Sequence, residues 1–420
     1  MEQIFTTMSD NEALAQHELF VLPGSERSDG RRLLYAPLAD ACLWVTDDEL
    51  HSIATNPPAE LVDVVPPSQR EGYIRTPEDF VNLSLLPNNI CNFHCSYCYS
   101  AYGRSHLQLQ LAQVTAAIDH LFTQTRPGRK HITIYGGGEP LLSWDNLVRP
   151  TLDHLMQWQQ RGADFYVTLI TNGSLLPDGF ADYCRTMHID LVCSFEVLRD
   201  VQEAQRGHYD LVRNNIQTLI RDGVIPALNS IITPLNVERQ EEMVREVQES
   251  YTGVRYLSFE PVLGGEQPVD DGFYRLFADG FRQAMAVAQA GGIELTCSAL
   301  RNVDVTVERY CAGELALVAD GSLIICPCLS SPQEPMFNHF VYGHVGTDGT
   351  VTIDTKRFDE LLTMNMHSQS WCRQCFARWN CGGGCTRETL RRGNTPDKAF
   401  CRFMQSFLRD ELLARMEESE

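Results

Sequence analysis

Residues 91–98 read Cys91-Asn92-Phe93-His94-Cys95-Ser96-Tyr97-Cys98, with three cysteines spaced three and then two residues apart. Three thiolates in one tight loop can hold three irons of a [4Fe–4S] cube and leave the fourth iron without a protein ligand. An iron left open in this way can bind a small chelating molecule. A zinc site normally takes four protein ligands in C-x2-C pairs, or three plus water, and rarely uses this spacing. The loop is therefore predicted to hold an iron–sulfur cluster.

Composition limits what kind of protein surrounds this loop. The 420 residues, 43% hydrophobic and 21% charged, are typical of a globular protein with a large catalytic domain and one or two smaller ones. A net charge of −21 argues against nucleic acid or an anionic membrane as a main partner. No apolar run approaches about 18 residues, and the polar start lacks a signal-peptide core, so we expect a cytoplasmic protein. In that reducing compartment the 15 cysteines are expected to be metal ligands rather than disulfides.

Residues 79–292 alternate apolar, strand-like runs with helix-period segments, which is the pattern of βα units around a parallel sheet. Six units are too few for a closed eight-stranded barrel, and in such folds chemistry sits at the C-terminal ends of the strands. The cysteine loop, Tyr135–Pro140, Thr171–Gly173 and Ser194–Glu196 follow the first four strands. The six candidate strands begin at Phe80, His131, Asp164, Ile189, Val224 and Val254.

Residues 293–420 carry a second concentration of cysteines. The run Cys372-x2-Cys375-x5-Cys381-x3-Cys385 is dense, and Gly382–Gly384 would let the chain wrap around a bulky inorganic core. A zinc ribbon would need only four cysteines in two C-x2-C pairs, whereas eight could fill two four-thiolate clusters. The eight are Cys311, Cys326, Cys328, Cys372, Cys375, Cys381, Cys385 and Cys401.

The loop at residues 91–98, with Tyr97 as its aromatic residue, resembles the C-x3-C-aromatic-C signature of radical S-adenosylmethionine (SAM) enzymes, and residues 137–140 resemble their GGEP motif. The resemblance implies an α/β fold, a partial (β/α)6 TIM-like barrel. It implies that Cys91, Cys95 and Cys98 hold a cluster whose open iron is chelated by SAM. One electron then cleaves SAM to a 5′-deoxyadenosyl radical, which abstracts hydrogen from an unactivated C–H bond.

The resemblance also implies the residues that contact SAM. The glycine motif would contact the amino group of the methionine, and polar groups at the third and fourth strand ends would lie near the methionyl and ribose parts. Most relatives have Asp where Glu196 stands. Arg206 is a candidate for the SAM carboxylate, because a guanidinium pairs well with a carboxylate, or else a surface residue at a helix start. The expected cofactor-binding residues are Tyr97, Gly137, Gly138, Glu139, Thr171, Asn172, Ser194, Glu196 and Arg206.

The later cysteines resemble the SPASM extension of radical SAM enzymes, a domain with two auxiliary [4Fe–4S] clusters. Gly321 precedes Cys326 at the spacing of that pattern. The resemblance implies that one cluster is held by Cys372, Cys375, Cys381 and Cys401, and the other by Cys311, Cys326 and Cys385. Cys328 is either the fourth ligand of the second cluster or a redox or hydrogen-donating thiol beside an open iron.

Residues 1–78 are expected to contain strands at 17–23 and 32–37 around a polar turn, and a helix from Asp47 through Ile53. Many peptide-modifying radical SAM enzymes carry an N-terminal winged-helix module that grips a leader peptide by adding a strand to its sheet. This segment is short for such a module. A leader-binding element and a plain lid on the barrel both remain open.

The resemblance is strongest to the maturases of ribosomally made (RiPP) peptides, and it implies a peptide-modifying oxidoreductase. We expect a 5′-deoxyadenosyl radical to abstract hydrogen from a precursor peptide and a C–C or thioether cross-link to form, with the auxiliary clusters taking electrons. A one-electron reductant such as flavodoxin or ferredoxin would be a partner. The alternatives are a peptide epimerase, a sulfatase-maturase-like or small-alcohol radical dehydrogenase and, outside enzymes, an iron–sulfur electron carrier or sensor.

Two features bear on these alternatives. Pro327 follows Cys326 where relatives that make formylglycine carry Asp, the expected proton acceptor, which disfavours the sulfatase-maturase interpretation. The general base is not assigned. Four acids near the first auxiliary cysteines are candidates for it or are solvated surface groups: Asp304, Glu308, Glu314 and Asp320.

Overall fold

The computed structural model describes residues 10–263, 269–311 and 313–419. The chain divides into two compact units, each built from separate segments. The first unit contains Met1–Tyr73, Ser298–Ala312 and Thr363–Glu420, and the second contains Ile74–Cys297 and Gly313–Leu362. The predicted division into residues 1–78, 79–292 and 293–420 remains a prediction about domains. Residues 313–362 fold with the barrel, although we had grouped them with the C-terminal cysteines.

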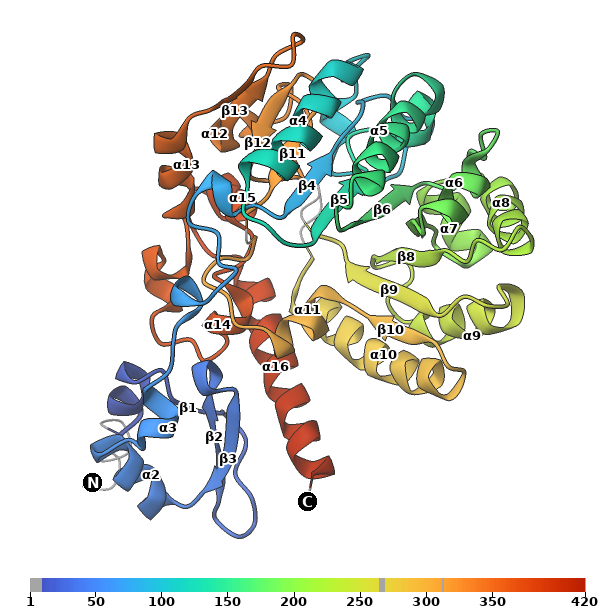
Figure 1. Ribbon diagram of the computed structural model, residues 1–420. Coiled ribbons are helices and arrows are strands. Elements are labelled where there is room, and N and C mark those ends of the chain that lie inside the picture. The colour runs from blue at the N-terminus through green and yellow to red at the C-terminus, as the bar shows by residue number, and fades with distance from the viewer. Residues whose placement is uncertain (1–9, 264–268, 312, 420) are drawn as a thin grey trace. The chain divides into compact units, whose positions relative to one another are not determined.

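The second unit is organised around an 11-stranded sheet with the order β10-β9-β8-β7-β6-β5-β4-β11-β12-β13-β14. Neighbouring strands from β10 through β4 to β11 pair in parallel (Figure 1). The six predicted strands are all present and begin within about three residues of the predicted starts, so the partial-barrel fold is confirmed. The strands are β4 (Asn82–Leu85), β5 (Lys130–Ile134), β6 (Phe165–Thr171), β7 (Asp190–Ser194), β8 (Ala227–Ile232), β9 (Tyr256–Pro261) and β10 (Glu294–Thr296), the last not predicted.

Helices cover the outer face of these strands (Figure 1). Leu85 and Ile134 lie against the helical side with Val114 and Leu147. Because side chains alternate along a strand, Ser84 and Tyr135 point to the opposite, inner face of the barrel. The helices are α4 (Leu111–Gln124), α5 (Arg149–Gln160), α6 (Phe180–Thr186), α7 (Arg199–Gln205), α8 (Tyr209–Arg221), α9 (Gln240–Ser250) and α10 (Asp271–Ala290).

Four further strands extend the sheet beyond β4. β11 (Leu315–Leu317) pairs in parallel with β4, and β12 (Ser322–Ile324), β13 (Val341–Val345) and β14 (Val351–Ile353) continue antiparallel. The short helices α12 (Phe337–Phe340) and α13 (Thr355–Leu362) accompany them. The pairing of β11 with β4 puts Glu314 next to the strand that leads into the first cysteine loop.

The first unit begins with an antiparallel sheet of β1 (Phe20–Val21), β2 (Arg32–Ala36) and β3 (Ala41–Val45). Two of these strands were predicted, and so was α2 (Asp47–Thr55), but β3 was not. The other helices are α3 (Ala59–Val62), α11 (Ser298–Arg301), α14 (Arg378–Cys381), α15 (Thr386–Arg391) and α16 (Lys398–Glu418). Within the described residues, no helix is long and apolar enough to cross a membrane.

The N-terminal sheet packs directly on the cysteine-rich segment of the same unit. Phe20 lies in one apolar cluster with Met366, Cys372 and Trp379. Glu18 accepts hydrogen bonds from the Arg378 guanidinium and from Trp379 Nε1, the latter at 2.6 Å. The residues before position 73 therefore stabilise the fold around the later cysteines.

Candidate active site

The loop with Cys91, Cys95 and Cys98 follows β4, and all three side chains are half-buried. Backbone hydrogen bonds from Ser96 N to Gln205 O (2.9 Å) and from Cys98 N to Cys95 O (3.2 Å) hold its second half. The Phe93 ring stacks on His208 with a centroid distance of 4.9 Å. The loop is thus fixed against the segment that follows α7, with three thiols on one short stretch.

Arg104 is a site residue that the sequence analysis missed. Its Nη2 donates a hydrogen bond to Cys98 Sγ at 3.2 Å. Burial acts to lower the pKa of Arg104, but the charges of Cys91 and Cys98 act in the opposite direction and the pKa is raised overall. Arg104 therefore places a positive charge beside two of the three expected ligands. Hydrogen bonds to cluster sulfurs and nearby charge are among the factors that set the reduction potential of a cluster.

The glycine motif is hydrogen-bonded to the backbone segment that leads into the cysteine loop. Gly138 N donates to Asn88 O (2.8 Å) and Glu139 N donates to Ile90 O (2.7 Å). A Cβ at Gly138 would lie only 1.8 Å from Ile90 O. We had expected the glycines to let the backbone approach a ligand; in this structure the close approach at Gly138 is to residues 88–90 of the chain itself.

The Gly138→Ala variant should be destabilised by about 3 kcal/mol, because the added methyl group meets backbone that cannot rotate away. Urea denaturation would measure the loss. The matched control is Gly272→Ala in α10, where the nearest atom to the new Cβ is a side-chain oxygen at 3.1 Å and helix propensity improves. Equal stability of the two variants would show that the contact at Gly138 is not a constraint.

Glu139 joins the ends of β5 and β6. Its buried carboxylate accepts hydrogen bonds from Thr171 Oγ1 (2.7 Å), Asn172 N (2.7 Å) and Leu141 N (3.1 Å). Burial raises the pKa of Glu139, although these donors act to lower it. The structure thus brings together Glu139, Thr171 and Asn172, three of the residues expected to contact SAM; the contact itself remains a prediction.

A second buried polar group links the cysteine loop to the end of β7. The Tyr97 hydroxyl donates to Glu196, and Arg206 Nη1 donates to the Tyr97 oxygen at 2.7 Å. Arg206 and Glu196 also form a buried ion pair at 3.8 Å. Burial raises the pKa of Glu196 to about 7, against the opposing effect of Arg206. Arg206 is therefore an interior residue of the site and not a surface residue.

Backbone strain marks the same strand end. Val197 directly follows Glu196, is fully buried and has φ of 63°. A β-branched residue rarely adopts this left-handed conformation, which persists where the surrounding structure enforces it. Gln202 contributes by accepting from Glu196 N at 3.0 Å. Ser194, the remaining expected contact at this strand end, is half-buried as the last residue of β7.

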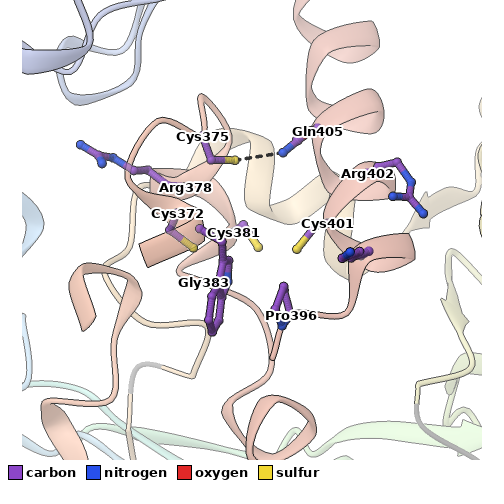
Figure 2. A pocket seen from close by; sticks show the side chains of 11 residues that line it. Cys372, Cys375, Arg378, Cys381, Gly383, Pro396, Cys401, Arg402 and Gln405 are labelled. Carbon is purple, nitrogen blue, oxygen red and sulfur yellow. Dashed lines mark hydrogen bonds between the residues drawn. The ribbon is translucent and has the colours of Figure 1, made fainter. Parts of the chain in front are cut away.

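Four cysteines of the first unit surround one cavity of about 260 Å³. Figure 2 shows the sulfur atoms of Cys372, Cys375, Cys381 and Cys401 directed toward its centre. Gly382, Gly383 and Gly384 follow Cys381 with φ between 60° and 87°, so the glycine run does turn the chain around this space. Arg378, Lys398, Arg402 and Gln405 also line the cavity.

The environment of these thiols is suited to a metal cluster bound by several thiolates. Burial raises the pKa of Cys372 to about 12 and that of Cys401 to about 11, so the free groups keep their protons near neutral pH. If a bound metal cluster displaced those protons, the three cations that line the cavity, Arg378, Lys398 and Arg402, would balance the negative charge of the thiolates. Gln405 Nε2 donates to Cys375 Sγ at 3.2 Å. Within the described residues, no three His, Cys, Asp or Glu side chains are grouped closely enough for a single metal ion.

The other cysteines fall into two sets. Cys184, Cys193 and Cys297 are buried in the second unit, as expected for core thiols. Cys42, expected in the core, is half-buried on β3. Cys326 and Cys328 belong to the second unit, whereas Cys311 and Cys385 belong to the first. The ligand set Cys311, Cys326 and Cys385, and the role of Cys328, therefore remain predictions.

Residues 85–249 match the family described as the radical SAM superfamily. Among curated proteins, the radical SAM cyclopropyl synthase TigE of Paramaledivibacter caminithermalis is 25% identical over 165 residues, which are 36% of this chain and 34% of TigE. The chain thus matches about a third of that relative's length. The serine-type anaerobic sulfatase-maturating enzyme of Klebsiella aerogenes is 21% identical over 348 residues, which are 76% of this chain and 83% of that protein.

Solved structures share the fold at low sequence identity. Native anSMEcpe with bound AdoMet and Cp18Cys peptide superposes with a TM-score of 0.63 at 15% identity, covering 80% of this chain and 99% of that one. Streptococcus suis SuiB bound to precursor peptide SuiA superposes with a TM-score of 0.55 at 14% identity, covering 81% of this chain and 78% of that one. These likenesses bear on the fold.

Proposed function

We propose that this chain, an enzyme with a radical SAM domain, modifies a ribosomally made precursor peptide by forming a cross-link within it. The bond would join two carbons, or carbon and sulfur, with loss of two hydrogen atoms. The observation that carries the proposal is the pairing of two sites in one chain. One is a three-cysteine loop built against a GGEP motif, and the other is a separate four-cysteine cavity.

The relatives support this choice of substrate. The sulfatase-maturating enzymes act on a protein, and two of the similar structures are named for a bound peptide. TigE is named for forming a ring, which is an intramolecular bond. For this chain, a peptide substrate and a one-electron reductant such as flavodoxin or ferredoxin are parts of the proposal.

The residues of the second unit fit a [4Fe–4S] cluster and SAM. Cys91, Cys95 and Cys98 would hold the cluster, and Arg104 would balance its charge through Cys98. SAM bound there supplies a 5′-deoxyadenosyl radical. Glu139 is oriented by Thr171 and Asn172, so it can receive the amino group of SAM at a fixed position. Tyr97, Glu196 and Arg206 would hold the loop to the end of β7 through a buried hydrogen bond and ion pair.

The four-cysteine cavity fits an auxiliary [4Fe–4S] cluster with Cys372, Cys375, Cys381 and Cys401 as ligands. When bound, such a cluster supplies an acceptor for the second electron of a cross-linking reaction. The second auxiliary cluster, on Cys311, Cys326 and Cys385, is proposed from the SPASM pattern alone. Pro327 continues to disfavour formylglycine formation, since that position offers no carboxylate.

Mass spectrometry of the reconstituted enzyme tests the function. The enzyme would be incubated with SAM, dithionite and the peptides encoded by short reading frames beside its gene. We expect a loss of two hydrogens per modification and one 5′-deoxyadenosine for each event. An unchanged mass in ordinary water, with gain of one deuterium in D₂O, would instead identify an epimerase. Absence of 5′-deoxyadenosine would leave the electron-carrier alternative.

A further inference from the structure

Glu314 is a carboxylate on the inner face of the barrel that the proposed SAM site does not use. It precedes β11, and Ser84 Oγ on β4 donates a hydrogen bond to Glu314 Oε2 at 2.5 Å. Burial raises the pKa of Glu314, against the effect of that hydrogen bond. The described residues place no Arg or Lys against it. It is therefore a half-buried carboxylate with one hydroxyl partner.

Glu314 lies near the residue that leads into the glycine motif. Tyr135, the residue before the glycine motif, has its pKa raised by burial and by the charges of Glu314, Tyr99 and Cys328. Tyr99 follows the last cysteine of the first loop, and Cys328 follows β12. All of these residues belong to the second unit. Tyr135 thus lies near Glu314, near Tyr99 of the segment after the cysteine loop, and near Cys328.

The other three acids that the sequence left as candidates for the general base have different surroundings. Asp304 forms an exposed ion pair with Arg415, and Asp320 accepts from Ser322 N (2.9 Å) and Ser322 Oγ (3.1 Å) within a turn. Glu308 accepts from Ser68 N at 3.0 Å in the first unit. Each of these carboxylates has a structural role at its own position.

The two buried carboxylates beside the cysteine loop, Glu139 and Glu196, are also engaged in hydrogen bonds or an ion pair. Glu139 accepts three hydrogen bonds, and Glu196 is bonded by Tyr97 and Ile231 N and paired with Arg206. Donors and cations stabilise the charged form of a carboxylate and weaken it as a base. Glu314 has one such donor, the Ser84 hydroxyl, so it is the carboxylate of the three that structural contacts engage least.

We propose that Glu314 is the proton acceptor of the oxidative step, an inference that rests on the proposed function. Forming a bond between two groups of a peptide removes two hydrogen atoms. One leaves as a hydrogen atom and converts the 5′-deoxyadenosyl radical to 5′-deoxyadenosine. The other leaves as a proton, which the Glu314 carboxylate takes, and as an electron, which passes to a one-electron acceptor of the iron–sulfur class.

The test compares Glu314→Gln with the wild-type enzyme on a deuterated peptide, encoded beside the gene and produced in deuterated medium. The amide keeps an oxygen for the Ser84 hydrogen bond but cannot take a proton. We expect Glu314→Gln to transfer deuterium into 5′-deoxyadenosine while cross-linked product falls by about a hundredfold or more. Binding of a fluorescently labelled peptide should be unchanged. Asp320→Asn is the control and should retain both signals.

The possible outcomes separate the two proposals. If the wild-type enzyme transfers no deuterium to 5′-deoxyadenosine, the proposed function fails and Glu314 has no such role. If the wild type does so and Glu314→Gln forms product at the wild-type rate, only the assignment of Glu314 fails. Loss of deuterium transfer together with weakened peptide binding in Glu314→Gln would make it a positioning residue. Ser84→Ala, which keeps the carboxylate, should lose less than about tenfold in product.

Discussion

Replacing Cys95 with alanine should reduce 5′-deoxyadenosine formation to the level seen without enzyme. Burial raises the pKa of the Cys95 thiol, and its other electrostatic neighbours are Arg206, Cys98, Cys91 and Glu196. Its side chain therefore lies near the other two loop cysteines and near the buried pair at the end of β7. A cluster that loses one of three protein ligands cannot hold an open iron in place for SAM. Chromatography of the reaction products measures the effect.

Iron analysis separates this loss from general misfolding. The Cys95→Ala protein should contain about four irons fewer than the wild type, with the remainder retained in the auxiliary sites. Cys184→Ala is the matched control, because Cys184 is also a buried thiol of the barrel but lies on α6, away from the loop. The control should keep full iron content and SAM cleavage. Undiminished SAM cleavage by Cys95→Ala would exclude the loop as the ligand set.

The barrel strands could be predicted because their signal is local. Each of β4 to β9 is an apolar run followed by a helical segment, and the polar groups at the strand ends follow from that order. β10 and β11 have three residues each, too few for a pattern. β11 joins the sheet through β4, more than 200 positions earlier, and pairing over such separation leaves no trace in one sequence. The position of Glu314 depends on this pairing of β11 with β4.

In the candidate site, too, local features could be predicted from the sequence and long-range contacts could not. The cysteines, Glu139, Thr171 and Glu196 could be proposed as site residues because motifs and strand ends fix their positions. What each side chain contacts was not predictable, since Glu196 is held by Tyr97 and Arg206 through a fold that brings β7 to the cysteine loop. Arg104 was missed because an arginine after a cysteine loop is ordinary in a sequence. Only its hydrogen bond to Cys98 distinguishes it.

Replacing Cys381 with serine should remove about four irons and lower the melting temperature of the first unit by about 5 °C or more. Cys381 is buried at the end of α14 and faces the cavity shared with Cys372, Cys375 and Cys401. Metal bound by the folded state alone adds its binding free energy to stability, so losing it destabilises the fold around it. Iron and sulfide analysis and calorimetry of the reconstituted protein provide the measurement.

In Cys381→Ser, formation of 5′-deoxyadenosine and formation of cross-linked peptide should respond differently. The proposed function places SAM cleavage in the second unit, so Cys381→Ser should still form 5′-deoxyadenosine, whereas cross-linked peptide should disappear because the proposed electron acceptor is gone. Cys42→Ser is the control in the same unit, since Cys42 is half-buried on β3 and does not line the cavity. It should retain its iron and its product. Full iron content in Cys381→Ser would mean that the four converging thiols bind no cluster, because a serine hydroxyl is a poor replacement for a terminal thiolate ligand of iron.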